Sequence, residues 1–168
     1  MIPEIKELVS DIPYSNLERS LEIVSLGGLI LMLYLILSTY SSLPDTMPHH
    51  FGIDGKPDAY GPKKILMILP LVSIFLFALL TVAEKFPHIG NYPYKITTQN
   101  AVRQVSLARK LILSLKAEII WLFLYIEWAA IQTGLGRAAG LGVWFFGVFM
   151  ILIFGTLIVY LRMAFLAR

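Results

Sequence analysis

The sequence predicts an all-α polytopic membrane protein. Its single domain, residues 1–168, is expected to be a bundle of four transmembrane helices with an ordered extracytoplasmic loop between the first two. Of the 168 residues, 57% are hydrophobic and only 15% are charged. Soluble domains carry about a quarter of charged residues, and a domain this small could not bury so much apolar side chain in its own core. A bilayer must therefore cover that surface.

Four apolar runs account for the predicted helices. They cover residues 23–40, 65–83, 111–131 and 141–161. A helix needs about 20 residues to cross the roughly 30 Å hydrocarbon core. Backbone groups without partners cannot lie in lipid, and the runs lack the two-residue alternation of barrel strands. We therefore expect each run to be a transmembrane α-helix.

Residues 1–22 precede the first run and are predicted to be cytoplasmic. The apolar residues Ile5, Leu8, Val9 and Ile12 recur there at helical spacing. This spacing is typical of a short amphipathic helix that lies at the membrane interface. A frayed acidic tail explains the segment equally well, so both interpretations stay open.

Residues 84–110 form the one sizeable loop predicted on the cytoplasmic side. Asn91-Tyr92-Pro93-Tyr94 indicates a turn, after which a helix is expected to run continuously into the third span. Arg103, Arg109 and Lys110 would lie near anionic headgroups, where each cation contributes about 1 kcal/mol. Lipid anchoring is the simpler interpretation, and a protein-docking site is the alternative.

The distribution of Lys and Arg predicts the orientation. Nine lie on the side of the termini: Lys6, Arg19, Lys85, Lys95, Arg103, Arg109, Lys110, Arg162 and Arg168. Four lie on the other side: Lys56, Lys63, Lys64 and Arg137. Basic residues concentrate in cytoplasmic loops, so both termini are expected in the cytoplasm and the loop 41–64 outside.

Composition also excludes several classes of site. There is no cysteine, so the chain has no disulfide framework, no thiolate metal site and no cysteine nucleophile. The net charge of +3 reports orientation in a membrane protein rather than affinity for nucleic acid. The bilayer itself is the first expected partner.

The loop 41–64 is dense in turn-forming and polar residues. Asp54-Gly55 suits a tight turn with a positive φ. Four prolines restrict the chain around it: Pro44, Pro48, Pro57 and Pro62. We therefore expect an ordered, hairpin-like cap.

Two histidines and several carboxylates make this cap the first candidate site. His49, His50 and Asp58 are candidate ligands for a divalent metal, with Asp45 and Asp54 nearby. The same groups could act as acid and base in catalysis. Their spacing matches no known metal signature, so a purely structural loop is the simpler interpretation.

The third apolar run contains the second candidate site. Lys116 and Glu118 are close enough to its cytoplasmic end to reach the headgroups, so interfacial anchoring is their simpler role. Glu127 lies deeper and needs a partner, because a buried carboxylate is costly without one. It shares a helix face with Lys116. We expect Glu127 to pair with His49 or His50 in one outward-facing polar site.

The loop also resembles a membrane domain of unknown function found at the N-terminus of SdpI-type bacterial immunity proteins. The family pattern is Leu-Pro, a Pro and a His shortly before a Phe, Gly-x-Pro-Asp and a Lys that opens the next span. The matching residues are Leu43-Pro44, Pro48-His49, Phe51, Gly55, Pro57-Asp58 and Lys63. Asn91-Tyr92-Pro93, followed by an Arg-bearing helix, is similar to the second half of the same family.

The resemblance implies a multi-pass protein of the cytoplasmic membrane of a bacterium or archaeon. Some members are linked to resistance against a secreted peptide toxin and to capture of a cytoplasmic repressor. The positions that transfer by motif are Pro48, His49, Phe51, Gly55 and Asp58.

The sequence is therefore compatible with three functions. The first is a non-enzymatic sensor or immunity-like protein, whose outer loop recognises an extracytoplasmic ligand or peptide through the motif, His50, Asp54 and Glu127. The second is a metal-dependent membrane hydrolase that uses His49 or His50 with Glu127. The third is an accessory subunit of a larger membrane complex.

Overall fold

The computed structural model describes residues 3–86 and 90–168 and is mostly helical. Residues 1–2 and 87–89, which belong to the predicted N-terminal segment and cytoplasmic loop, lie outside the described residues. The helices are α1 (Pro3–Ser10), α2 (Asn16–Thr39), α3 (Ile68–Lys85), α4 (Ala101–Gly134) and α5 (Phe145–Leu166). Two strands, β1 (Thr46–Phe51) and β2 (Pro57–Pro62), and two 3₁₀ turns, η1 (Tyr40–Ser42) and η2 (Lys63–Met67), connect α2 to α3.

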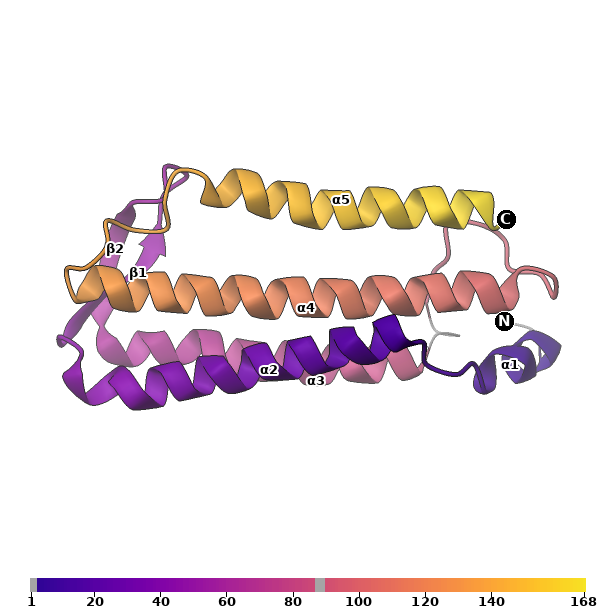
Figure 1. Ribbon diagram of the computed structural model, residues 1–168, viewed down its shortest axis with the longest axis horizontal. Coiled ribbons are helices and arrows are strands. Elements are labelled where there is room, and N and C mark those ends of the chain that lie inside the picture. Colours follow the sequence, from indigo (N-terminus) through magenta and orange to yellow (C-terminus); the bar gives the residue numbers. More distant parts are fainter. Residues whose placement is uncertain (1–2, 87–89) are drawn as a thin grey trace.

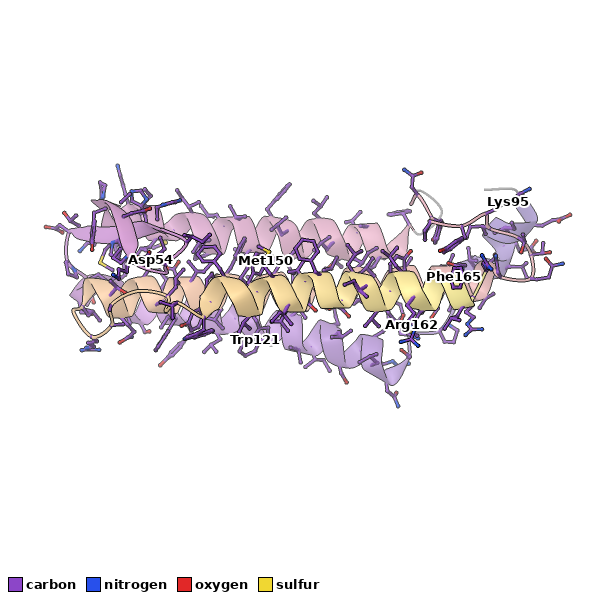
Figure 2. All side chains as sticks on the ribbon, turned by 90° about the horizontal axis from the view of Figure 1, so that it is seen from above. Asp54, Lys95, Trp121, Met150, Arg162 and Phe165 are labelled. Carbon is purple, nitrogen blue, oxygen red and sulfur yellow. The ribbon has the colours of Figure 1, made fainter. Side chains whose placement is uncertain are left out.

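The four long helices lie side by side along the long axis of the molecule (Figure 1). The β1–β2 hairpin lies at one end, which we call the hairpin end. Helix α1 and the C-terminus lie at the other, which we call the terminal end. Figure 2 places Asp54 at the hairpin end, and Lys95 and Arg162 toward the terminal end.

Three stretches are long and apolar enough to cross a membrane. They are Asn16–Ser42, Lys63–Lys85 and Phe145–Leu166, and they include α2, α3 and α5. Most of their large apolar side chains face outward. The prediction of a mostly helical chain is thus confirmed, and three of its helices are long and apolar enough to span a membrane.

Helix α4 has a different composition and a central position. It packs against α2, α3 and α5. Its predicted span contains three charged residues, Lys116, Glu118 and Glu127, whereas the charged residues of α2, α3 and α5 lie near the ends of those helices. The helix is continuous through the predicted third span, residues 111–131.

The last helix begins later than the predicted span 141–161. Gly142 has a φ of 86°, and Leu141 N donates to Gly55 O over 2.7 Å. These residues are therefore held in a turn against the hairpin, and α5 starts only at Phe145. The predicted N-terminal segment 1–22 is also divided, because α2 already begins at Asn16.

The terminal end is closed by α1. Ile5 and Val9 of α1 are buried against Ala101 and Val105 of α4. The described part of the N-terminal segment is therefore a helix docked on α4, rather than a frayed tail.

The hairpin is an antiparallel pair that sits on the bundle. Its register is irregular between Pro48 and Phe51, at the two histidines. Met47 and Phe51 are buried and pack in one cluster with Leu66 of η2 and Ala130 of α4. Both histidines therefore lie where the pairing of the two strands is irregular.

Candidate functional site

Glu127 lies near the hairpin end of α4 and has no partner. Its side chain is fully buried, and neither carboxyl oxygen has a hydrogen-bond partner among the residues that the structure describes. Burying a polar group without a partner costs roughly 2–7 kcal/mol, and a charge costs more. An orphaned carboxyl at this depth marks a candidate site rather than a packing element.

A cavity of about 490 Å³ lies beside Glu127. The hairpin, η2, α3, α4 and α5 all contribute to its wall. Five phenylalanines line it: Phe51, Phe123, Phe145, Phe146 and Phe149. The ionisable groups in its wall are Glu127, His49 and His50. Its size and apolar lining are typical of a site for a small organic ligand.

The histidines do not make the predicted pair with Glu127. His50 Nδ1 lies 2.5 Å from Asp58 Oδ1, and both side chains are largely exposed. The His49 ring lies against Gly61, where an added Cβ would be 2.9 Å from its Cδ2. The structure therefore brings His49, His50 and Glu127 to one cavity without a hydrogen bond between them.

The remaining motif residues hold the hairpin together. Pro48 is fully buried, and Phe51 is buried in the cluster beneath the strands. Asp54 Oδ1 accepts from Lys56 N over 3.1 Å and shapes the turn. Gly55 has a φ of 76° and lies so close to Gly142 that a Cβ would be 2.5 Å from its carbonyl oxygen.

The candidate metal ligands do not converge. Within residues 3–86 and 90–168, no group of three or more His, Cys, Asp or Glu side chains is placed to hold a metal ion. His50 and Asp58 form a pair, which His49 does not join.

A cluster of charged residues that was not predicted from the sequence lies toward the terminal end. Lys116, fully buried, forms ion pairs with Glu22 of α2 and with Glu84 of α3, the latter at 3.4 Å. Lys116 Nζ also donates to Thr81 Oγ1 over 3.0 Å. The predicted headgroup anchoring of Lys116 is therefore wrong, because its ammonium lies between three helices.

Arg109 forms the second part of this cluster. Its Nε donates to Glu18 Oε1 over 2.7 Å, and both side chains are buried. Its other nitrogens donate to the carbonyl oxygens of Ile12 and Pro13, at 3.0 and 2.9 Å. The interpretation of Arg109 as a lipid anchor is wrong, because these contacts use its guanidinium inside the protein.

Tyr14 links the two parts of the cluster. Its ring lies 4.2 Å from Arg109 Cζ, and its hydroxyl donates to Glu84 Oε1 over 3.4 Å. Burial, and then the charge of Glu84, raise the pKa of Tyr14 above its ordinary value. The hydroxyl therefore stays protonated and available as a donor.

A signal for this cluster was present in the sequence. Glu22 immediately precedes the first apolar run and Glu84 immediately follows the second, so both lie toward the end of the spans that Lys116 lies near in the third. An intramembrane cation needs a counter-ion at its own depth. Depth thus suggests Glu22 and Glu84 as candidate counter-ions for Lys116, although only the fold shows that their helices are neighbours.

Glu118 is the remaining charged residue of the span. Thr156 Oγ1 on α5 donates to its Oε1, and its Oε2 is buried without a partner. Glu118 therefore joins α4 to α5 and does not serve as the predicted interfacial anchor.

The fold defines a mostly helical protein with three helices suited to span a membrane. Residues 27–74 match a family described as "Domain of unknown function (DUF1648)". This stretch contains most of α2, the whole hairpin, η2 and the first part of α3. It includes every motif position between Leu43 and Lys63.

A protein of Archaeoglobus fulgidus, described as uncharacterized, is similar to part of this chain. The two are 36% identical over 87 residues, which are 51% of this chain and 48% of the relative. The matched part thus spans about half the length of that curated relative. No solved structure matches the chain.

Proposed function

We propose that this protein is a non-enzymatic sensor or immunity-like protein of the cytoplasmic membrane, which recognises an extracytoplasmic ligand in the cavity beneath its hairpin. The observation that carries the proposal is the buried, unpartnered Glu127 in the wall of a mostly apolar cavity. A protein that needed only a stable bundle would gain stability by replacing this carboxyl with an apolar group.

Four membrane crossings are part of the proposal. Helix α4 lies among the three apolar helices, and Lys116 and Glu127 are buried inside the bundle rather than turned to lipid. Helix α1 and the C-terminus lie at the same end of the bundle, as an even number of crossings requires (Figure 1). The excess of Lys and Arg at that end supports a cytoplasmic location for the termini.

The continuity of α4 supports a sensing role. One unbroken helix carries Glu127 beside the cavity and Lys116 and Arg109 in the ion cluster. A ligand that moved α4 at the hairpin end would change the geometry of ion pairs at the cytoplasmic end. The prokaryotic membrane and the immunity-like role are supported by the resemblance carried by the hairpin motif.

A thermal-shift screen of the full-length protein in detergent tests the proposal. A ligand at 100 times its Kd stabilises the folded state by about 2.7 kcal/mol and so raises the Tm. We expect a small molecule or peptide to raise the Tm, and the variant Ala130→Leu, which fills part of the cavity, to abolish the shift. Gly147→Leu is the matched control, because nothing lies within 4 Å of a Cβ at Gly147.

The other two functions predict different outcomes. A hydrolase would consume the ligand, which mass spectrometry of the incubated ligand would detect. Stoichiometric metal, lost in a His49→Ala, His50→Ala double variant, would favour the metal-dependent form. Co-purification of a stoichiometric membrane partner, with no ligand found, would favour the accessory subunit.

A further inference from the structure

The cavity lacks a cation for its carboxyl. Among the described residues that line it there is no Lys or Arg, and Glu127 has no hydrogen-bond donor. The buried cations of α4 are already engaged, Lys116 with Glu22 and Glu84, and Arg109 with Glu18. Of the two histidines in the wall, His50 is paired with Asp58.

The aromatic lining of the cavity also favours a positively charged ligand. Five phenylalanine rings contribute to the wall. The face of an aromatic ring attracts a cation through its quadrupole, and sites that bind quaternary ammonium groups combine such rings with little competing water. A buried carboxyl among phenyl rings is complementary to a cation with an apolar body.

We propose that the cavity binds an organic cation, whose charged group pairs with Glu127 and whose apolar body lies among the phenylalanines. This inference rests on the proposed function and names its ligand class. A neutral apolar occupant would leave the carboxyl buried and unpaired, and an anion could not form an ion pair with it, whereas a cation stabilises its ionised form. Glu127 is fully buried, so the ligand reaches it by displacing neighbouring side chains.

Two ions of the same shape and opposite charge test the proposal. Equilibrium dialysis of the full-length protein in detergent micelles would compare tetraphenylphosphonium with tetraphenylborate, with empty micelles as the blank. We expect saturable binding of one phosphonium per chain and no binding of the borate above the blank. Equal binding of the two ions, or no phosphonium binding by folded protein, would overturn the proposal.

Two isosteric variants locate the charge. Glu127→Gln removes the charge and keeps the shape, so we expect phosphonium affinity to fall by at least about tenfold. Glu118→Gln, which alters the other carboxyl of the third span, should bind within about twofold of the unaltered protein. Unchanged affinity in Glu127→Gln would contradict the inference.

A labelling experiment on the unaltered chain removes any dependence on how the variants fold. Dicyclohexylcarbodiimide modifies carboxyl groups in apolar surroundings, and peptide mass spectrometry locates the label. Phosphonium should protect Glu127 and leave labelling of Glu118 unchanged, while borate should protect neither. Equal protection of the two carboxyls, or protection of neither, would count against the site.

The failures of the two proposals are distinguishable. If the thermal-shift screen finds a neutral or anionic ligand whose effect Ala130→Leu abolishes, the cavity is a recognition site and only the ligand class is wrong. If phosphonium binds at Glu127 but is chemically converted on incubation, the ligand class is right and the non-enzymatic function is wrong.

Discussion

Arg109 on α4 and Glu18 on α2 form a buried ion pair, with 2.7 Å between Nε and Oε1. Glu18 is also the N3 residue of a capping box, in which it accepts from Ser15 N while Ser15 Oγ accepts from Glu18 N. The same carboxylate therefore starts helix α2 and joins it to α4. Arg109 in turn holds the carbonyls that lead from α1 into α2.

Replacing Arg109 should destabilise the protein strongly. In Arg109→Met the carboxylate of Glu18 loses its cation, and breaking one partner of a buried pair costs about 3–5 kcal/mol. Titration with a denaturing detergent, followed by circular dichroism, measures the free energy of unfolding. Arg103→Met is the control, because Arg103 is exposed and should change stability little. Equal stability of the two variants would show that the pair contributes nothing.

Lys116 is expected to contribute more to thermal stability than Lys110 of the same helix. Lys116→Met leaves Glu22 and Glu84 facing each other without a cation, so it should unfold at a lower temperature than Lys110→Met. Combining Lys116→Met with Glu84→Gln should recover part of the loss, because one uncompensated charge is removed. Thermal unfolding of the unaltered protein, Lys116→Met, Glu84→Gln and the double variant measures the coupling, and simple additivity would contradict it.

Hydropathy predicted most of the helices, because a bilayer excludes a backbone whose polar groups are not hydrogen-bonded. A long apolar run in lipid has to form a helix, so 23–40 and 65–83 fall within observed helical stretches. The start of α5 could not be predicted, since it depends on the hydrogen bond from Leu141 to Gly55, far away in the sequence.

The candidate site was only partly predictable for a similar reason. Glu127 was identified from its depth alone, and the histidines from their loop. Whether a histidine reaches Glu127 depends on the irregular register of β1, and His50 pairs with Asp58 instead. The sequence does not show which helices are neighbours, so lipid headgroups were the expected partners of Arg109 and Lys116 in place of the carboxylates that they contact.

Gly55 should tolerate no side chain. In Gly55→Ala the new Cβ would lie 2.5 Å from Gly142 O, at a φ of 76° that disfavours L residues. We expect a loss of about 1–3 kcal/mol, with loosening of the hairpin from the turn before α5. Gly147→Ala is the matched control, because it lies in a helix in open space, where alanine is favoured over glycine. Thermal unfolding compares the two, and a Gly55→Ala protein as stable as the control would contradict the close approach.

The orientation in the membrane can be measured cleanly because the chain contains no cysteine. Single cysteines at Ile53, which is 87% exposed at the hairpin tip, and at Ala139, exposed before α5, should react with a membrane-impermeant maleimide in intact cells. A cysteine at Gln99, exposed before α4, should react only after the cells are permeabilised. This pattern follows if α4 crosses the bilayer and the basic end faces the cytoplasm. Labelling of all three positions in intact cells would contradict the crossing of α4, and the reverse pattern would invert the orientation, placing the ligand cavity on the cytoplasmic side.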